Sequence, residues 1–311
     1  MRAILYGLAA SLFFASTFVL NRAMELEGGH WAWSASLRFF FMLPLLFFLV
    51  ALRGGLGASL RHLKRLWREY LIWSIVGFGF FYAPICFAAG YGQGWLVAAS
   101  WQITIIAGPL LSPFLLRPES KNAFGRGAFF SAVPFKAMRW SLLILAGIAL
   151  MQWQHATAIS GTQALYCVLP VLAAAFAYPL GNRKMMEICA DDVDTFQRVL
   201  NMTLASLPFW AALAVYGFAA YGPPTGAQAT QSFLVALCAG IVATLLFFAA
   251  TNLVKRDPAR LAAVEATQAG ELVFALAGEM IFLAAPLPSA LSMAGIALVI
   301  VGMLLHSLRS T

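Results

Sequence analysis

The sequence is dominated by ten apolar stretches, each long enough to cross about 30 Å of hydrocarbon as a helix. Inside a bilayer the backbone has to satisfy its own hydrogen bonds, which a helix does within one segment. The sequence therefore predicts an all-α integral membrane protein with ten transmembrane helices. The stretches comprise approximately residues 3–21, 33–52, 70–89, 95–116, 140–154, 162–181, 196–217, 232–254, 261–283 and 288–308.

The composition supports a polytopic membrane protein and argues against other classes. Of the 311 residues, 62% are hydrophobic and 10% are charged, whereas roughly one quarter of an ordinary globular domain is charged. The net charge of +8 is compatible with nucleic-acid binding, but the placement of the basic residues argues against that partner. The four cysteines do not suggest a disulfide framework or a metal site, so we expect no metal and no cofactor.

The basic residues predict the orientation in the membrane. All but two of the 20 Lys and Arg residues lie at the chain ends or in and beside the second, fourth, sixth and eighth loops, and the odd-numbered loops after the first have none. By the positive-inside rule, both termini are expected to be cytoplasmic. The first apolar stretch has no small-residue cleavage site, so we expect it to be retained. The expected location is a bacterial inner (plasma) membrane.

Two segments of the sequence occur twice. Residues 5–25 resemble residues 165–187, both ending in an Asn-Arg pair followed by methionine and glutamate. The pentapeptide Ala-Gly-Ile-Ala-Leu occurs at 146–150 and again at 294–298. The matches keep the same order along the chain, which indicates an internal repeat.

The repeat divides the chain into residues 1–154 and residues 155–311, with five predicted helices in each. Five is an odd number, so the second copy enters the membrane in the opposite direction. Inverted repeats of this kind are typical of alternating-access transporters, whose substrate site lies near the membrane midplane between the halves. The sequence thus favours a transporter on topology alone.

Several motifs also resemble a known superfamily. Phe-Ala-Ser-Thr-Phe at 14–18, Asn-Arg at 21–22 and the segment 30–38 resemble the first two helices of the drug/metabolite transporter (DMT) superfamily, in its ten-span, EamA-like multidrug resistance efflux branch. Gly-Glu at 278–279, followed by glycines in the tenth stretch, is similar to the superfamily's C-terminal signature. The resemblance covers essentially the whole chain. It implies a ten-helix bundle that exports small organic molecules without an ATPase.

The ninth stretch carries three acidic residues that need an explanation. At about 100° per residue, Glu265, Gln268, Glu271 and Glu279 fall on one face of the helix. Such a polar stripe has to face protein or a water-filled cavity, because a charge in hydrocarbon is costly. Glu271 lies closest to the membrane centre and is predicted to bind a cationic substrate or a proton. The alternative is a hydrogen-bonded structural acid.

The remaining substrate-binding candidates are polar or aromatic residues inside other apolar stretches. Glu265 lies near the cytoplasmic end, where it lines the cavity, reaches the interface or pairs with Arg260. Gln268 either lines the cavity or forms a hydrogen bond between helices. The aromatic and amide candidates, for which packing against other helices is the alternative, are Trp101, Gln102, Tyr82, Tyr166 and Tyr178.

Buried charges elsewhere predict two ion pairs. Arg38 and Glu279 both lie toward the outer side, and an unpaired buried charge costs several kcal/mol. The inverted repeat then relates this pair to Arg198 and Glu119 near the cytoplasmic side. The sequence leaves open whether these are structural pairs or gates that form and break.

The sequence contains no Walker loop, no Gly-x-Ser-x-Gly motif and no metal-ligand spacing, so no enzyme activity is expected. The favoured function is secondary active export of small cationic or amphipathic molecules, with proton coupling left open. An amino-acid or metabolite exporter without ion coupling is the alternative, and a membrane-embedded lipid enzyme is a remote one. The expected partners are a small organic solute, lipid and, in the coupled case, protons, but no nucleic acid. A monomer is sufficient, and a dimer is compatible.

Overall fold

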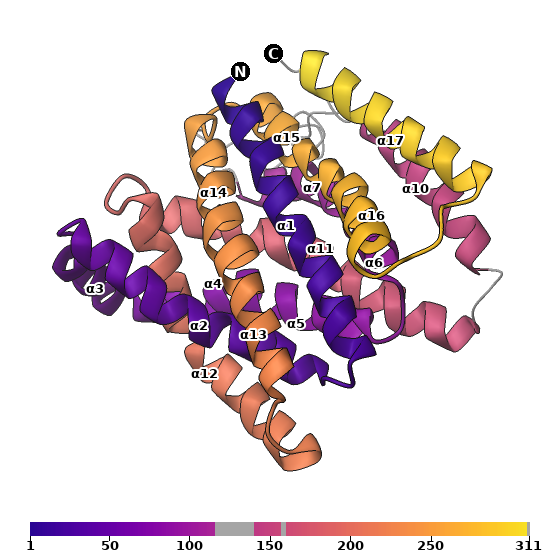
Figure 1. The fold of residues 1–311 in the computed structure, drawn as a ribbon. Helices are drawn as coiled ribbons and strands as arrows, with labels where there is room; N and C mark the ends of the chain where they lie inside the picture. Colours follow the sequence, from indigo (N-terminus) through magenta and orange to yellow (C-terminus); the bar gives the residue numbers. More distant parts are fainter. Residues whose placement is uncertain (116–139, 157–159, 310–311) are drawn as a thin grey trace.

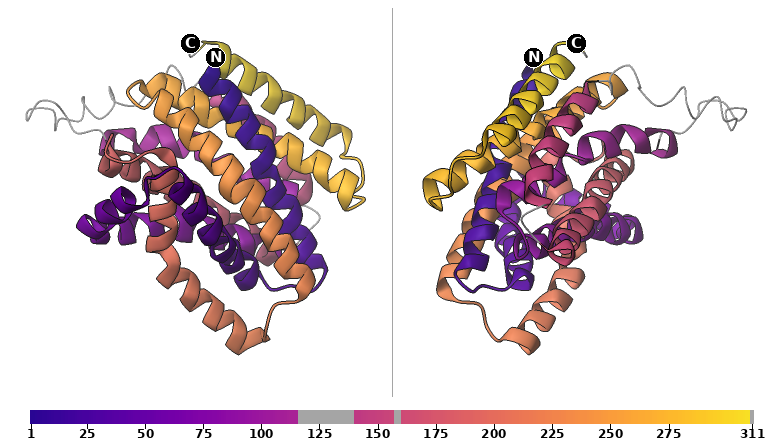
Figure 2. Two further views of the ribbon diagram at one scale, coloured as in Figure 1. Left: turned by 60° about the vertical axis from the view of Figure 1, so that its left-hand side comes forward. Right: turned by 90° about the vertical axis from the view of Figure 1, so that its right-hand side faces the viewer.

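A computed structural model describes residues 1–115, 140–156 and 160–309 (Figure 1). Every regular element within these ranges is a helix, and no strand occurs in them. The prediction of an all-α chain is therefore confirmed. The N- and C-termini lie side by side at one end of the helix bundle in all three views (Figures 1 and 2), and this end is called the terminal end below.

Six helices in the described ranges are long and apolar enough to cross a membrane. They coincide with the first, second, third, sixth, seventh and eighth predicted stretches, and they support a multi-pass membrane protein. They are α1 (Arg2–Leu26), α2 (Trp31–Leu52), the run from α4 (Trp67–Ser74) through α5 (Phe80–Ala89), α11 (Gly161–Cys189), α12 (Thr195–Tyr221), and the run from α13 (Gly226–Val235) through α14 (Thr244–Leu253).

The other four predicted stretches form shorter or interrupted helices. The fourth is divided into α6 (Gly94–Trp101) and α7 (Thr104–Leu115), and the ninth into α15 (Pro258–Ala266), the 3₁₀-helix η3 (Thr267–Ala269) and α16 (Gly270–Phe282). The fifth and tenth correspond to α10 (Ser141–Ala156) and α17 (Ala290–Arg309). A further short helix, α3 (Leu56–Arg65), occupies a stretch that the sequence assigns to a loop.

The two interrupted helices change their hydrogen-bond pattern at the interruption. Between α6 and α7 the amides of Gln102, Ile103 and Ile105 bond to the carbonyl three residues earlier, which is the 3₁₀ spacing. The 3₁₀-helix Thr267–Ala269 does the same between α15 and α16. A tight turn of this kind inside a helix often marks a functional hinge. Periodicity alone predicted continuous helices in both places.

Two of the long helices contain a wider turn instead. The run α4–α5 includes the π-helix η1 (Ile75–Gly79), and the run α13–α14 includes the π-helix η2 (Ala236–Ala243). Gly77 in η1 lies against Gly181 of α11 so closely that a Cβ at either position would meet the other backbone. Small residues allow membrane helices to approach in this way. Here they fix α11 against the π-turn.

The helices pack in pairs taken from the two halves of the chain. The most extensive contacts join α10 with α17, α2 with α12, and α5 with α11. Figure 1 shows α10 and α17 side by side along one flank of the bundle. At their contact Gly147 and Gly295 face each other, and a Cβ on either would meet the carbonyl oxygen of the other. These two glycines are the second residues of the two copies of the repeated pentapeptide.

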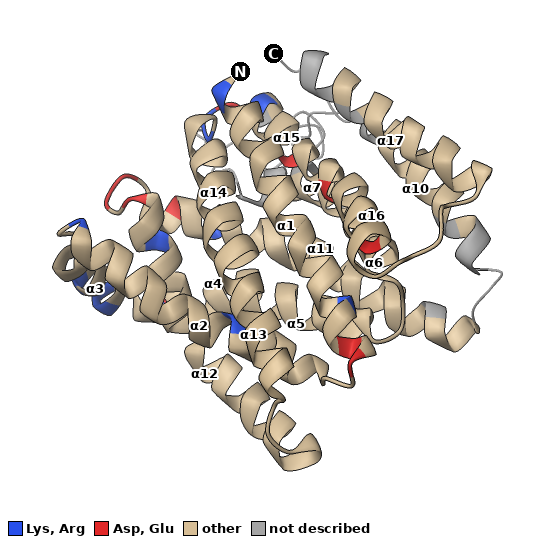
Figure 3. Cartoon of the chain, in the orientation of Figure 1, with Lys and Arg blue, Asp and Glu red and all other residues tan. Residues whose placement is uncertain are grey.

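Charged residues are sparse along the helices of the bundle. Figure 3 shows basic residues on α3 and near the terminal end, while most of the helix surface carries no charge. Three acidic residues on α15 and α16, Glu265, Glu271 and Glu279, nevertheless lie inside the bundle, where they are buried. Their environment identifies the candidate site.

Candidate functional site

Two adjoining cavities lie between the interrupted helices. The first, called the Arg198 chamber, encloses about 380 Å³, including its opening to solvent. The second, called the Glu271 chamber, comprises about 260 Å³ of space between atoms, again including its opening to solvent. Both chambers are narrow, since the centre of a water molecule can reach only about 20 Å³ of the first and about 10 Å³ of the second. Tyr178 and Gln268 line both, so they form the boundary between the chambers. The Arg198 chamber is lined by Thr104, Tyr178, Pro179, Asn182, Arg183, Met186, Arg198, Phe247, Phe248, Thr251, Leu261, Glu265 and Gln268, and the Glu271 chamber by Phe14, Thr17, Phe18, Phe81, Ile85, Trp101, Tyr178, Gln268 and Glu271.

The interruptions place the key side chains on these cavities. Gln268 lies inside the 3₁₀-helix η3, and Glu271 lies in the first turn of α16 directly after it. Trp101 ends α6 and Thr104 begins α7, so they flank the other interruption. Residues at the break points of both interrupted helices therefore line the same two adjoining chambers. These two chambers together are called the path below.

Glu271 is the acidic residue that lines the Glu271 chamber. It is only 2% exposed, and the polar side chains that face its carboxyl group are Gln268 and Trp101. Its Oε1 atom has no hydrogen-bond partner among the described residues. Leaving a buried acceptor unsatisfied is costly, so this atom is available to a ligand or a proton.

Aromatic rings surround the approach to Glu271. The ring centroid of Phe81 lies 5.0 Å from that of Trp101 and 4.5 Å from that of Tyr178, and Trp101 and Tyr178 are 5.4 Å apart. Aromatic faces attract cations, and this attraction is strongest where water is excluded. A carboxyl group next to three rings is suited to an organic cation.

Glu265 lies in the Arg198 chamber and forms an ion pair with Arg183. Both side chains are 9% exposed, and Arg183 Nη2 lies 2.7 Å from Glu265 Oε2 and 2.8 Å from Oε1. A Cβ at Gly108 would collide with the Glu265 carboxylate, so glycine leaves room for the pair. The suggested pairing of Glu265 with Arg260 is wrong in this structure, because Arg260 lies 3.4 Å from Asp257.

Arg183 is a site residue that sequence reasoning missed. It was assigned to a loop because a basic residue close to a predicted span end normally reports orientation. In the structure α11 extends to Cys189, which places Arg183 inside the helix. The signal that could have identified it is the internal repeat, since the Asn-Arg pair at 182–183 matches the pair at 21–22.

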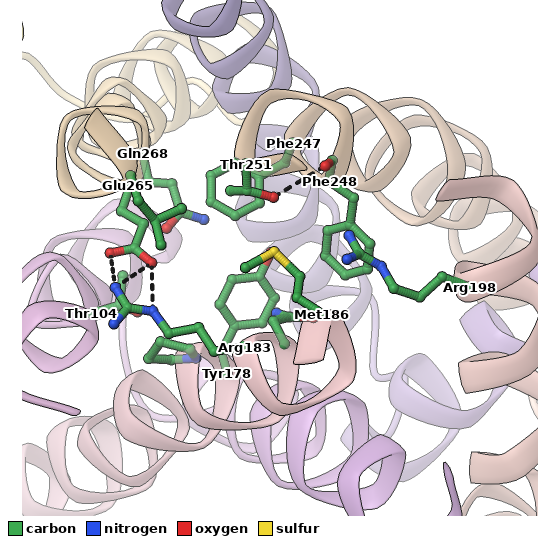
Figure 4. Close-up of a pocket in the computed structure, with 13 residues that line it drawn as sticks. Thr104, Tyr178, Arg183, Met186, Arg198, Phe247, Phe248, Thr251, Glu265 and Gln268 are labelled. Atoms are coloured by element: carbon green, nitrogen blue, oxygen red, sulfur yellow. Dashed lines mark hydrogen bonds and ion pairs between the residues drawn. The ribbon is translucent and has the colours of Figure 1, made fainter. Parts of the chain in front are cut away.

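Arg198 lies across the Arg198 chamber from the Arg183–Glu265 pair (Figure 4). Its guanidinium group is 4.2 Å from the centroid of the Phe248 ring, and Nη1 donates to Asn252 at 3.2 Å. Within the described part of the chain its Nε has no hydrogen-bond partner. The residue predicted to pair with it, Glu119, lies outside the described residues.

The predicted pair between Arg38 and Glu279 is not formed in this structure. The Arg38 guanidinium lies 4.1 Å from the centroid of the Tyr82 ring. The Glu279 carboxylate instead accepts hydrogen bonds from the backbone N–H groups of Gly94 and Trp95, at 2.7 and 3.4 Å. These two amides begin α6, and a helix N-terminus stabilises a negative charge. Each predicted partner therefore has another source of stabilisation.

Three other predicted binding residues line neither chamber. Gln102 donates to the carbonyl oxygen of Ala98 in its own helix turn. Tyr82 donates to Asn21 beneath Arg38. Tyr166 is 45% exposed and its ring lies near that of Tyr91. The structure thus gathers Glu271, Gln268, Glu265, Trp101 and Tyr178 on the path and leaves these three elsewhere.

No group of three or more His, Cys, Asp or Glu residues with the geometry of a metal site occurs within the described ranges. The lining of the two chambers is mostly apolar and offers charge, hydrogen bonding and aromatic contact at a few positions. It is suited to binding a small molecule that has both an apolar body and polar groups.

Comparison with known proteins gives matches along the whole chain. The model of the EmrE family, described as "Putative multidrug resistance efflux transporter", matches residues 1–311. The chain is 53% identical over 310 residues to "Uncharacterized protein YjlA" of Bacillus subtilis, covering 100% of this chain and 95% of that protein. It is 46% identical over 271 residues to "Uncharacterized 42.1 kDa protein in intracellular alkaline protease 3'region" of Shouchella clausii, covering 87% of this chain and 70% of that protein. A solved crystal structure with 15% sequence identity superposes with a TM-score of 0.67 over 99% of this chain and 97% of the other, which shows a shared fold.

Proposed function

The chain belongs to the EmrE family of multidrug resistance efflux transporters, and we propose that it exports small cationic or amphipathic organic molecules across a membrane by alternating access. Membership of a transporter family supports a non-enzymatic role. The proposal concerns the substrate class, the route and the mechanism of this chain.

The observation that carries the proposal is the Glu271 chamber. It combines one buried carboxyl group, which has an oxygen without a partner among the described residues, with the rings of Phe81, Trp101 and Tyr178. A cation with an apolar body gains both an ion pair and cation–π contacts there. Glu271 offers one acceptor to either a substrate cation or a proton, so binding of one opposes binding of the other. This competition supports proton-coupled exchange.

Alternating access follows from an architecture of two inverted five-helix repeats, residues 1–154 and 155–311, with ten spans in total. Three features support this architecture. The interruptions occur in the fourth and ninth predicted spans, which correspond in the two repeats, and the π-helices occur in the third and eighth. Gly147 and Gly295, which occupy equivalent positions of the repeated pentapeptide, contact each other. An interface between equivalent positions is expected at a pseudo-two-fold axis.

Interrupted helices are a recurring feature of transporter binding sites, because the freed backbone and the hinge lie at the substrate. In this chain both interruptions border the same path. We place the terminal end in the cytoplasm and the protein in a bacterial inner membrane, as the distribution of basic residues predicts. The Arg198 chamber is then the cytoplasmic entrance, and the Glu271 chamber lies deeper in the membrane.

Orientation is tested by single cysteines introduced at Thr225 and at Lys64 in intact cells. Thr225 lies in the turn between α12 and α13, Lys64 lies in α3, and both are exposed. An impermeant thiol reagent should label the cysteine at 225 and spare the one at 64. The reverse pattern would place the termini outside. Ser59 in the same helix is unsuitable because it is buried and donates to Asn201.

Transport is tested by uptake into inside-out membrane vesicles. Tetraphenylphosphonium and methyl viologen serve as cationic probes, and an imposed pH gradient, acidic inside, tests coupling to protons. The account predicts saturable uptake that the gradient accelerates and a protonophore abolishes. Uptake equal to that of vesicles lacking the protein, for both probes and with the gradient present, would reject the proposed function.

A further inference from the structure

Several buried polar atoms without hydrogen-bond partners belong to residues that line the two chambers, while others lie elsewhere in the bundle. Besides Glu271 Oε1, those on the chambers include the Tyr178 hydroxyl, both amide atoms of Asn182, Arg198 Nε and the Thr17 hydroxyl, none of which has a partner among the residues that the structure describes. All five residues line one chamber or both. Buried polar groups in proteins are normally satisfied, so unpartnered atoms that line a cavity are available to a polar ligand.

The two chambers differ in charge. The Arg198 chamber is lined by two cations, Arg183 and Arg198, and by one anion, Glu265. Arg183 and Glu265 form an ion pair, which leaves the charge of Arg198 without a paired anion in that lining. The Glu271 chamber is lined by a single ionisable acid, Glu271. One chamber therefore favours an anionic group and the other a cationic group.

The two charges lie at opposite ends of the path. Arg198 lines only the Arg198 chamber and Glu271 only the Glu271 chamber, while Tyr178 and Gln268 lie at the boundary between them. Figure 4 shows the long side chain of Arg198 reaching into its chamber alongside Phe248. A ligand that contacts both charged groups has to carry its own charges at separated positions.

We propose that Arg198 and Asn182 form an anion subsite, and that the preferred substrate is an elongated zwitterion with a carboxylate at Arg198 and an ammonium group at Glu271. The substrate class rests on the proposed function, since it assumes that both chambers belong to one transport path. The carboxylate accepts from Arg198 Nε and from the Asn182 amide. The ammonium group donates to Glu271 Oε1 among the rings of Trp101 and Phe81. Pairing both buried charges within one molecule removes the cost of leaving either unpaired.

The test compares ligands that share one carbon chain and differ in charge. The probes are ε-aminocaproate, which has both charges, hexylamine, which has the cation only, and hexanoate, which has the anion only. The shorter zwitterion γ-aminobutyrate tests the length. Binding is measured by isothermal titration calorimetry on the purified full-length protein in lipid nanodiscs, with empty nanodiscs subtracted. We expect ε-aminocaproate to bind at least about tenfold more tightly than each of the other three, because a charged hydrogen bond is among the stronger polar contacts.

Variants assign the preference to the subsite. Arg198→Gln should weaken binding of ε-aminocaproate about tenfold and change binding of hexylamine less than about twofold. Asn182→Ala, which removes a side chain without a hydrogen-bond partner in the described structure, should weaken ε-aminocaproate alone and preserve folding. Arg38→Gln is the matched control. Arg38 is also a buried arginine over an aromatic ring, but it lines neither chamber.

Three results would overturn the proposal. The first is equal affinity for ε-aminocaproate and hexylamine, and the second is an equal loss of both in Arg198→Gln and Asn182→Ala. The third is a change in ligand binding that depends on Arg198 when chloride replaces gluconate in the buffer, with no preference for the zwitterion. That result would indicate a site for an inorganic anion.

Uptake of tetraphenylphosphonium separates the subsite hypothesis from the transport hypothesis. Uptake without a zwitterion preference rejects only the subsite. Zwitterion binding that depends on Arg198, together with absence of uptake, rejects only the transport function.

Discussion

The two interrupted helices use the same backbone device but carry different chemistry. The break between α6 and α7 is flanked by Trp101 and Thr104, neither of which is charged. The break between α15 and α16 is flanked by Glu265 and Glu271, with Gln268 inside it. One break thus supplies an aromatic ring and a hydroxyl group, and the other supplies acids.

The difference lies in the side chains, because both breaks share the 3₁₀ hydrogen-bond spacing. Under the proposed alternating access, the two breaks would act as matching hinges. The proposal then assigns the binding of substrate and proton to Glu271 beside the charged break. The predictions below test each part of this contrast, beginning with the charged break.

The largest effect is expected from breaking the ion pair at the charged break. Arg183→Met leaves Glu265 buried without its partner, and the loss of one member of a buried pair costs about 3–5 kcal/mol of stability. The double variant Arg183→Met with Glu265→Leu should recover most of this loss. Thermal unfolding of the detergent-solubilised protein measures both. Equal unfolding temperatures for the wild-type protein and the single variant would show that the pair does not stabilise the fold.

The next prediction compares the loss of transport in variants of Glu271, beside the break between α15 and α16, and of Gln102, in the break between α6 and α7. Glu271→Gln should reduce transport of cations about 30-fold or more, since removing a buried charged partner typically costs 2 kcal/mol or more. Gln102→Leu, at the break between α6 and α7, should change transport less than about threefold, because Gln102 lines neither chamber and its amide nitrogen donates within its own helix. Vesicle uptake of tetraphenylphosphonium compares them. Similar losses in both variants would remove the contrast between the breaks.

Much of this arrangement was predictable from the sequence. All ten predicted stretches contain helices in the described ranges, because hydrophobic length is a strong signal for membrane helices. The polar face of the ninth stretch placed Glu271 and Gln268 together, since residues three or four positions apart share a helix face. Trp101 and Tyr178, two further predicted binding residues, line the same chamber as these two.

The rest depended on contacts between distant segments, which periodicity does not report. The partner of Glu265 is 82 residues away in sequence, on α11, and Arg183 was taken for a loop residue. Glu279 was expected to need a cation, but backbone amides at the start of α6 stabilise it instead. Tyr82 and Gln102 are residue types that often bind ligands, yet the Tyr82 hydroxyl donates to Asn21 and the Gln102 amide nitrogen donates to the backbone, which leaves only Gln102 Oε1 without a partner among the described residues. Sequence alone does not distinguish a satisfied polar group from a free one.

A smaller effect, on the apparent affinity for a cation, is expected from Trp101 at the break between α6 and α7. Trp101→Leu should weaken the apparent affinity for tetraphenylphosphonium about tenfold, because a desolvated cation–π contact contributes roughly 1–2 kcal/mol. Trp101→Phe keeps an aromatic face and should lose about threefold or less. The concentration dependence of vesicle uptake measures the apparent affinity. If leucine and phenylalanine at this position behave alike, the ring makes no specific contribution.

The smallest effect concerns His62 on α3, far from both breaks in sequence. Burial, with a smaller contribution from Arg65, holds the pKa of His62 below its ordinary value of 6.5, although Asp192 opposes the shift. The folded state therefore favours neutral His62, so its contribution to stability is complete above pH 6.5 and decreases as the pH falls below it. His62→Gln should flatten the pH dependence of the unfolding temperature between pH 7.5 and about 5.5. An unchanged slope would show that His62 does not set it.

The central claim is that the two breaks border one substrate path, and ligand protection tests it directly. Single cysteines at Thr104, which lines the Arg198 chamber, and at Thr17, which lines the Glu271 chamber, are introduced after the four native cysteines are replaced by alanine. A cysteine at the exposed Thr225 serves as control. The account predicts that tetraphenylphosphonium slows maleimide labelling at 104 and 17 with the same half-maximal concentration and leaves labelling at 225 unchanged. Protection at only one of the two positions, or at neither, in variants that still bind the cation, would contradict a single path.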